Sequence, residues 1–96
     1  MNVRYGIIGL GEISRHFASV LKKTEGLELT AVASRDQARS DAFAEEYDAR
    51  KACATYLDVI TSSDVDIVYI GLTHNFHFEM TKLCLEHHKA VLCEKP

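Results

Sequence analysis

Short apolar runs alternate along the chain with longer segments that have the period of a helix. Buried strands are predicted at residues 3–9, 27–34, 65–71 and 90–93, and a short extended piece at 52–54. Helices are predicted from the spacing of apolar residues at 12–23, 37–47, 55–60 and 75–88. Strands that alternate with helices of these lengths indicate βαβ units. The pattern therefore predicts an α/β fold with a doubly wound parallel sheet and helices on both faces.

Each long helix is expected to bury one stripe of side chains against the sheet. In the first helix the expected stripe is Ile13, Phe17, Val20 and Leu21. In the second it is Ala42, Phe43 and Tyr47, and in the last it is Phe76, Met80, Leu83, Cys84 and His87. Gly26 is expected to form the C-cap of the first helix, because glycine favours the left-handed conformation there.

Composition narrows the classes of protein to consider. The 96 residues suit one domain, and 47% hydrophobic with 26% charged residues is ordinary globular usage. A net charge of -3, with acidic and basic residues mixed, argues against a nucleic-acid or anionic-membrane surface. No run approaches the ~18 apolar residues of a membrane span, and Cys53, Cys84 and Cys93 have no disulfide-framework spacing. We therefore expect a cytoplasmic protein with neither a nucleic-acid nor a membrane partner.

The sharpest local feature is the segment GIIGLGEIS at residues 6–14. Gly9 and Gly11 follow the first predicted strand and precede the first predicted helix. Glycines at these places permit a tight turn and let the backbone approach a pyrophosphate, while the helix N-terminus supplies N–H donors and partial positive charge. The backbone at Glu12, Ile13 and Ser14 is expected to complete this phosphate site.

Ser14 stands where a third glycine is usual in such turns. A residue this small still permits close packing of helix on strand, and its hydroxyl is a candidate phosphate donor. Two other interpretations of the turn stay open: the glycines only turn the chain, or the turn belongs to a methyltransferase that uses S-adenosylmethionine.

The end of the second predicted strand bears on which cofactor is bound. Proteins that bind NAD usually carry an acidic residue there, which accepts a hydrogen bond from the ribose 2′-hydroxyl. This chain has Ser34, followed by Arg35 and Asp36. A guanidinium suits a 2′-phosphate, and Asp36 is expected to cap the next helix. The residues favour NADP over NAD, with use of both still open, and they disfavour a methyltransferase.

Taken together, these motifs resemble the N-terminal domain of the Gfo/Idh/MocA oxidoreductases, a family with a Rossmann-type dinucleotide-binding fold. The matching segments are GIIGLGEIS, AVASRD, DVDIVYIG and the terminal AVLCEKP, together with His77. The resemblance covers essentially all 96 residues. Within the family, GLTHNFH and LCEKP look most like the dimeric dihydrodiol dehydrogenase branch.

The resemblance implies roles for particular residues. Lys95 matches the family's catalytic lysine, Glu94 would contact the nicotinamide-side ribose, and the Lys95–Pro96 bond is expected to be cis. His77 would lie beside the cofactor, with Leu72 and His74 as further contacts in the turn before it. This chain departs from the T-P-N that is common in that turn. It also has His88 where the family usually has a glycine, so His88 is expected at a left-handed or adjusted helix end.

The implied function is transfer of a hydride between NAD(P) and a secondary alcohol of a sugar, cyclitol or diol. Family enzymes continue into a second α/β domain that supplies most of the substrate pocket and the oligomer interface. We therefore expect residues 1–96 to be an incomplete NAD(P)-binding domain, truncated before that domain, from a parent homo-oligomer. A non-catalytic NAD(P)-binding sensor or assembly module is the alternative.

The histidine pairs at 74/77 and 87/88 lack acidic or cysteine partners, so no metal is expected.

Overall fold

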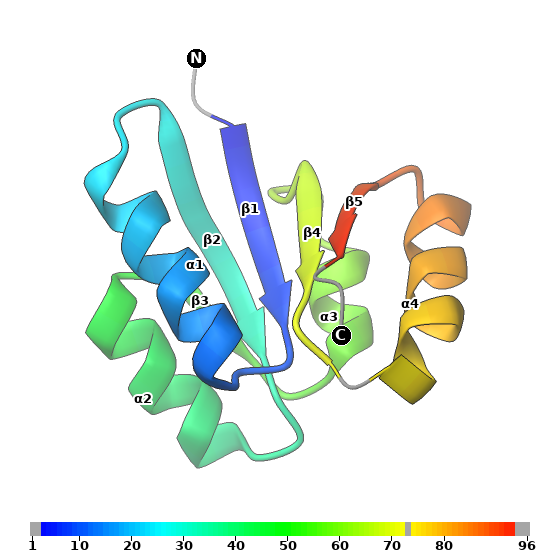
Figure 1. Cartoon of the computed structure of the whole chain (residues 1–96), viewed down its shortest axis with the longest axis horizontal. Coiled ribbons are helices and arrows are strands. Elements are labelled where there is room, and N and C mark those ends of the chain that lie inside the picture. Colours follow the sequence, from blue (N-terminus) through cyan, green and yellow to red (C-terminus); the bar gives the residue numbers. More distant parts are fainter. Residues whose placement is uncertain (1–2, 73, 94–96) are drawn as a thin grey trace.

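The computed structural model describes residues 3–72 and 74–93, which form five strands and four helices. In chain order these are β1 (Val3–Ile8), α1 (Glu12–Lys23), β2 (Leu27–Ala33), α2 (Gln37–Tyr47), β3 (Lys51–Cys53), α3 (Tyr56–Ile60), β4 (Ile67–Ile70), α4 (His74–Glu86) and β5 (Ala90–Cys93). All four strand pairings are parallel, in the order β3-β2-β1-β4-β5 (Figure 1). The predicted doubly wound α/β fold is confirmed.

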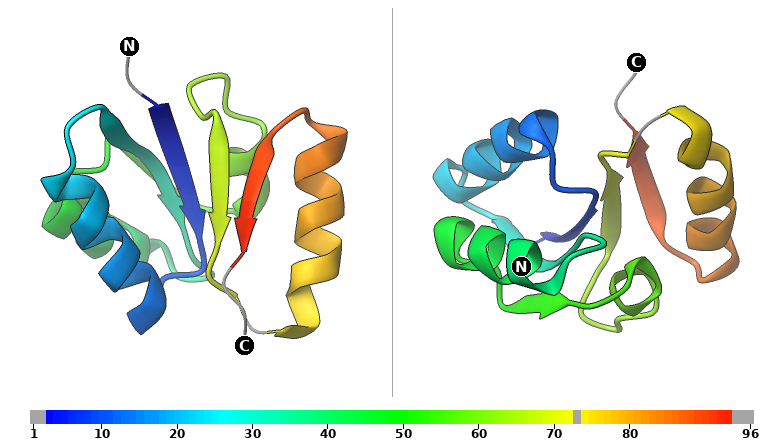
Figure 2. Two further views of the ribbon diagram at one scale, coloured as in Figure 1. Left: turned by 45° about the horizontal axis from the view of Figure 1, so that its top comes forward. Right: turned by 90° about the horizontal axis from the view of Figure 1, so that it is seen from below.

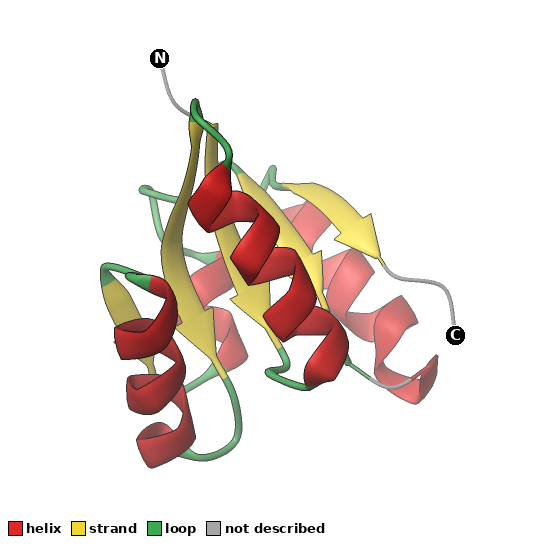
Figure 3. Cartoon of the chain, turned by 60° about the vertical axis from the view of Figure 1, so that its left-hand side comes forward, coloured by secondary structure: helices red, strands yellow, loops and turns green. Residues whose placement is uncertain are grey.

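Helices cover both faces of the sheet (Figures 2 and 3). Each face has its own core of buried side chains. Successive side chains of a strand point to opposite faces, so the central strands supply both cores. Ile7 and Tyr69 belong to the core beneath α1 and α2, where the Phe17 ring stacks on Tyr69 with centroids 4.1 Å apart. Ile8 and Ile70 belong to the core beneath α3 and α4.

The stripe predicted for α1 is only half right. Leu21 is buried and Phe17 packs on the core, but Ile13 is 54% exposed and Val20 is 44% exposed. Ser14 and Ala18 are buried in their place. The Ser14 hydroxyl reaches the Gly9 carbonyl, so α1 lies close to the end of β1 there and a small side chain faces the strands.

Of the other two long helices, α2 repeats this preference for small residues, and α4 does not. In α2, Phe43 is buried and Tyr47 packs beside it as predicted, but Ala42 is exposed while Ser40 and Ala44 are buried. In α4, Cys84 is buried and Met80 and Leu83 pack on the core as predicted, whereas His87 is exposed. The side chain of Phe76 lies outside the described part of the chain.

The two predicted helix ends have different outcomes. The C-cap of α1 is Thr24, and Gly26 lies two residues further on, in the turn into β2. α4 ends in a Schellman motif in which the Lys89 N–H donates to the Cys84 carbonyl at 2.9 Å. His88 has a φ of 61° in that motif, so its predicted left-handed conformation is confirmed.

Parallel pairing brings the carboxyl ends of the strands to one edge of the sheet, the lower edge in Figure 1. The segments that follow β1, β2, β3 and β4 therefore meet there, and ligands of doubly wound sheets bind at such edges. Among the described residues, no helix is both long and apolar enough to cross a lipid bilayer.

Candidate cofactor-binding site

A cleft of about 500 Å³ opens at the carboxyl edge of the sheet, between the ends of β1, β2 and β4. Its walls come from segments far apart in the sequence: Gly9, Leu10, Gly11, Ser34, Arg35, Asp36, Arg39, Tyr56, Gly71 and Leu72. Five of the predicted cofactor residues are thus brought together here, namely Gly9, Gly11, Ser34, Arg35 and Leu72. The fold places the two motifs that suggested a nucleotide on opposite sides of one cavity.

Gly9 is required by the fold itself. Its φ is 85°, a region that side chains other than glycine rarely adopt. A Cβ at this position would stand 2.8 Å from the Gly71 carbonyl oxygen and 2.7 Å from a methyl carbon of Leu72. The Gly9 N–H also donates to the Ala33 carbonyl at 3.0 Å, which fixes the turn against the end of β2.

Gly11 is different, because the described part of the chain gives no steric reason for a glycine there. Its φ is -88°, and no described atom lies within 4 Å of the place where a Cβ would stand. Gly11 is the N-cap of α1, so its missing side chain leaves clear the space before the helix N-terminus. This is where a ligand that approaches the helix end would need room.

The N-terminus of α1 has the properties of an anion site. The first turn of the helix is closed by the Arg15 N–H, which donates to the Gly11 carbonyl at 3.0 Å. The N–H groups of Glu12, Ile13 and Ser14 precede that bond, in the part of a helix where backbone donors have no intrahelical acceptor. Together with the helix dipole they can bind a phosphate. The role predicted for these three backbone groups stays a prediction.

Ser14 contributes packing at this turn. Its side chain is 1% exposed, and its hydroxyl donates to the Gly9 carbonyl at 2.5 Å. The small residue therefore does permit close contact of α1 with the strand ends, as expected. The expectation that the hydroxyl donates to a phosphate is wrong for this conformation, because its one hydrogen is given to Gly9 and the group is buried.

The turn after β2 is held by a compact hydrogen-bond network. The Ser34 N–H donates to the Ser40 hydroxyl at 3.0 Å, and the Ser34 hydroxyl donates to the Asp36 carbonyl at 2.8 Å. Ser34 and Ser40 are both buried, which protects these bonds from water. Arg35 lies between the fixed residues and lines the cleft. The network therefore positions the backbone that carries Arg35.

The carboxylate of Asp36 is turned toward α2. It accepts a hydrogen bond from the Ala38 N–H at 3.0 Å and so caps the helix, as predicted. The acidic group that follows β2 thus serves the helix N-terminus, whereas an NAD-type site uses such a group to hold the ribose hydroxyls. This arrangement leaves two arginines, Arg35 and Arg39, as the cationic side chains in the lining of the cleft.

Arg39 and Tyr56 are site residues that the sequence analysis missed. Arg39 is the third residue of α2, and its Nη2 donates to the Leu10 carbonyl at 3.0 Å. It therefore ties α2 to the glycine turn across the cleft. Tyr56 is the first residue of α3, just beyond the end of β3. Tyr56 could have been predicted because it follows a strand, and ligands bind at the carboxyl ends of strands. Arg39 could have been predicted because it lies in the first turn of the helix that follows Arg35.

The opposite wall is fixed by His77. Its Nε2 lies 2.7 Å from the Leu72 carbonyl oxygen, so the ring donates through Nε2 and ties α4 to the turn after β4.

The side chain of His74 and residues Glu94 and Lys95 lie outside the described residues, as does the Lys95–Pro96 bond. Within the described ranges, no three His, Cys, Asp or Glu residues gather as a metal site would require.

Residues 3–96 match the model of a family described as "Oxidoreductase family, NAD-binding Rossmann fold", the Gfo/Idh/MocA family. The chain belongs to this family. A Gfo/Idh/MocA domain that binds NAD accounts for the glycine turn, the strand order and the location of the cleft together. The resemblance noted in the sequence is confirmed.

Among curated relatives, the human trans-1,2-dihydrobenzene-1,2-diol dehydrogenase is 41% identical over 98 residues. The match covers 100% of this Gfo/Idh/MocA chain and 29% of that protein. The Xenopus tropicalis enzyme of the same name is 32% identical, with 30% of its length covered. The chain therefore spans about three tenths of the length of the curated relatives it matches.

Solved structures of the family have the same fold. KijD10, a 3-ketoreductase from Actinomadura kijaniata in complex with TDP-benzene and NADP, superposes with a TM-score of 0.95 at 32% identity. That match covers 100% of this chain and 30% of KijD10. An NAD-binding oxidoreductase from Klebsiella pneumoniae gives a TM-score of 0.93 at 26% identity, over 99% of this chain and 27% of that one.

Proposed function

We propose that this chain is the cofactor-binding part of an oxidoreductase that uses NADP(H), and that oxidises a secondary alcohol of a diol or sugar or catalyses the reverse reduction. The observation that carries the proposal is the polar lining of the cleft. The N-terminus of α1 lies on one side, and Arg35 and Arg39 lie on the side of β2. These groups match the two anionic parts of NADP, the pyrophosphate and the 2′-phosphate.

The residues of the chain would bind and orient the cofactor, which itself supplies the hydride chemistry. The N–H groups at Glu12, Ile13 and Ser14 would hold the pyrophosphate, with Gly11 keeping the approach clear. Arg35 would accept the 2′-phosphate through charge-assisted hydrogen bonds. In this proposal Arg39 adds a second guanidinium while its bond to Leu10 keeps the glycine turn in place.

The preference for NADP rests on the turn after β2. A 2′-hydroxyl is best held by a carboxylate, but Asp36 caps α2. The solved KijD10 complexes contain NADP, which supports the same choice. Because Asp36 still lines the cleft, binding of NAD with lower affinity is part of the proposal.

The reaction assigned to the parent protein rests on the family resemblance and the printed activities of the relatives. These act on a dihydrobenzene diol and as a 3-ketoreductase. Lys95 is proposed to exchange a proton with the substrate hydroxyl, with Glu94 at the nicotinamide-side ribose and His77 and His74 beside the cofactor. The substrate pocket and a homo-oligomeric interface are proposed for a further domain of a cytoplasmic parent protein.

The direct test is titration of the purified chain with NADPH and with NADH, followed by nicotinamide fluorescence. We expect saturable binding of both, with NADPH favoured by about tenfold or more, since one charge-assisted contact contributes about 1.5–3 kcal/mol. Arg35→Ala should remove most of that preference. Arg50→Ala, an exposed arginine at the other edge of the sheet, is the matched control and should change neither affinity.

Two outcomes would contradict the proposal in different ways. Equal binding of both dinucleotides by the wild-type chain would remove the role of Arg35 while keeping the dinucleotide site. Absence of binding by a chain whose circular dichroism shows a folded α/β protein would reject the site itself.

A further inference from the structure

The sheet has an open side next to β5, its last strand in the order β3-β2-β1-β4-β5 (Figure 1). Among the described residues, no strand pairs with the side of β5 that faces away from β4, here called the outer side of β5. The Ala90 N–H donates to the Asp66 carbonyl at 3.3 Å, so Ala90 bonds toward β4. Because bonding directions alternate along a strand, the N–H and C=O groups of Val91 and Cys93 point to the outer side.

β5 carries none of the charged side chains that usually protect an end strand. At the other end of the sheet, β3 begins with the exposed Lys51, and lysine discourages pairing with a further strand. β5 instead carries Leu92, which is 42% exposed. Leu92 is aligned with Tyr69 of β4, so its side chain lies on the face of the sheet that carries α1. An apolar side chain thus lies beside the backbone groups that point outward.

On the other face of the sheet, α4 presents a second apolar surface in the same direction. Leu83 and Cys84 of this helix pack on the core. Phe78 and Leu85 lie two turns apart on the flank opposite Leu83, and they are 79% and 61% exposed. This flank faces away from α3 and toward the outer side of β5, since α4 is the last helix on that face (Figure 2). It borders a groove of about 440 Å³, lined by Phe78, Thr81, Lys82, Leu85 and Glu86.

We propose that the outer side of β5 and this flank of α4 bind a second copy of the chain, in a two-fold dimer whose sheet continues across the interface. Antiparallel pairing of β5 with itself about Leu92 sets Val91 of each copy opposite Cys93 of the other, which satisfies the outward groups. The two Leu92 side chains then face each other directly. The inference does not depend on the proposed function, because the cleft lies between the ends of β1, β2 and β4.

The flank of α4 favours a second copy over other partners of the strand. The same two-fold axis brings the two α4 helices side by side and antiparallel, with Phe78 of one copy near Leu85 of the other. Lys82 and Glu86 border the groove with opposite charges, so two copies of this flank do not present a single sign of charge to each other. A peptide strand added to β5 would leave Phe78 and Leu85 in water, whereas a second copy covers both.

Sedimentation equilibrium of the purified chain tests the dimer, and we expect association to twice the mass of one copy. Phe78→Glu and Leu85→Glu should each raise the dissociation constant at least about tenfold, because every dimer loses two buried apolar side chains. Leu57→Glu, at an exposed leucine on α3, is the matched control and should leave the constant unchanged. All three variants should keep the circular dichroism of the wild type, since these side chains are exposed in a single copy.

Crosslinking tests the register of the two strands. Leu92→Cys places two thiols across the axis, in a pair whose Cα atoms lie about 4.5 Å apart, within the range of a disulfide. Mild oxidation with oxygen and a copper catalyst should link this variant into covalent dimers, whereas the wild type and Leu57→Cys should stay unlinked. A folded wild-type chain that remains monomeric at submillimolar concentration would overturn the proposal and leave the surface to a different partner. A dimer that neither glutamate substitution weakens, or that Leu92→Cys fails to crosslink, would overturn this interface.

Discussion

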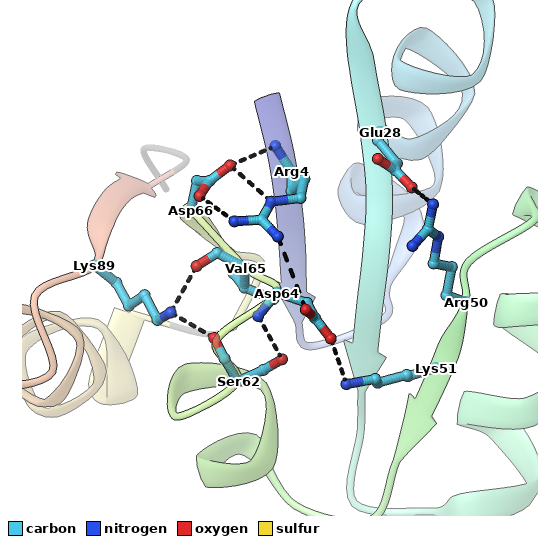
Figure 4. Close-up of polar contacts among 9 residues, drawn as sticks. All are labelled: Arg4, Glu28, Arg50, Lys51, Ser62, Asp64, Val65, Asp66 and Lys89. Carbon is cyan, nitrogen blue, oxygen red and sulfur yellow. Dashed lines mark hydrogen bonds and ion pairs between the residues drawn. The ribbon is translucent and has the colours of Figure 1, made fainter. Parts of the chain in front are cut away.

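Charged groups have different roles at the two edges of the sheet, where the strands begin and where they end. At the amino edge, charges pair with one another (Figure 4). The Arg4 guanidinium forms two hydrogen bonds with the Asp66 carboxylate, at 3.0 and 3.2 Å, and Asp66 also accepts from the Arg4 N–H at 3.0 Å. Lys51 pairs with Asp64 at 2.9 Å. Hydrogen bonds from Arg4 and from Lys51 lower the pKa of Asp66 and of Asp64 respectively.

Two further links continue this edge toward both sides of the sheet. Arg50 pairs with Glu28 at 2.7 Å, and the Lys89 ammonium donates to the carbonyls of Ser62 and Val65 at 2.5 and 2.6 Å (Figure 4). The first contact joins the residue before β3 to β2, and the second joins the segment before β5 to the segment before β4. At this edge, the charged groups serve the fold.

At the carboxyl edge, donors and cations border a cleft. The first N–H groups of α1, Arg35 and Arg39 line or adjoin it, while the nearby Asp36 carboxylate caps a helix. The charged residues that stabilise the fold thus lie at the amino ends of the strands, and those that can bind a ligand lie at the carboxyl ends. Substitutions at one edge should therefore change stability, and at the other edge binding, with Gly9 as the residue that belongs to both.

The largest effect is expected from Gly9→Ala. The substitution forces an alanine to a φ of 85° and a Cβ to within 2.8 Å of the Gly71 carbonyl oxygen, so the free energy of unfolding should fall by about 3 kcal/mol. Urea denaturation followed by circular dichroism measures this loss.

Gly11→Ala is the matched variant that sharpens the comparison. It meets no described atom and needs no unusual φ, so its stability should stay within about 1 kcal/mol of the wild type. Its affinity for NADPH should nevertheless fall at least about tenfold, because the methyl group occupies the approach to the helix end. Equal destabilisation by both substitutions would break the distinction between a glycine that the fold needs and one that the ligand needs.

Arg39→Ala should have the next largest effect. Loss of one charge-assisted contact corresponds to about 1.5–3 kcal/mol, so NADPH should bind roughly 10- to 100-fold more weakly, and NADH should be affected much less. Fluorescence titration measures both affinities. Arg50→Ala gives the comparison at the amino edge, and a similar loss there would show that net charge alone governs binding.

His88→Gly should stabilise the chain by about 1 kcal/mol, because glycine adopts the left-handed turn at the end of α4 without steric cost. Thermal unfolding should show a higher midpoint, with unchanged NADPH affinity. His87→Gly, one residue earlier, should give no such gain, since positive φ is recorded for His88 and not for His87.

The smallest effect is expected from Asp66→Asn. The pKa of Asp66 is lowered in the folded chain, so its contribution to stability is present above its ordinary value of about 4 and is lost as the pH falls through the lowered pKa. The variant should therefore unfold slightly earlier at neutral pH, by a few degrees at most, because the pair is exposed. The difference between the two proteins should shrink as the pH falls below about 4.

Most of the fold follows from the sequence because the apolar runs and the helical spacing are strong signals. Every predicted element occurs, with ends that match or differ by at most two residues. The failures concern which side chains face inward. Ile13 and Val20 are exposed while Ser14 and Ala18 are buried, because the distance between helix and sheet selects small residues, and apolar periodicity carries no information on that distance.

The site residues that could be predicted are those that directly follow a strand with a recognisable sequence motif. The glycine turn and Arg35 adjoin strands that could be recognised directly, and both line the cleft. Arg39 and Tyr56 reach it from the first turns of two helices. Their positions depend on how α2 and α3 lie against the sheet, which tertiary packing decides.

The contact of Ser14 with Gly71 constrains how this turn can evolve. A Cβ at Gly71 would collide with the Ser14 hydroxyl oxygen, so Gly71→Ala requires that Ser14 become smaller first. Ser14→Gly would remove that oxygen and restore the third glycine of the common motif. The two positions are therefore epistatic: Gly71→Ala is tolerated only after Ser14→Gly, and not before it.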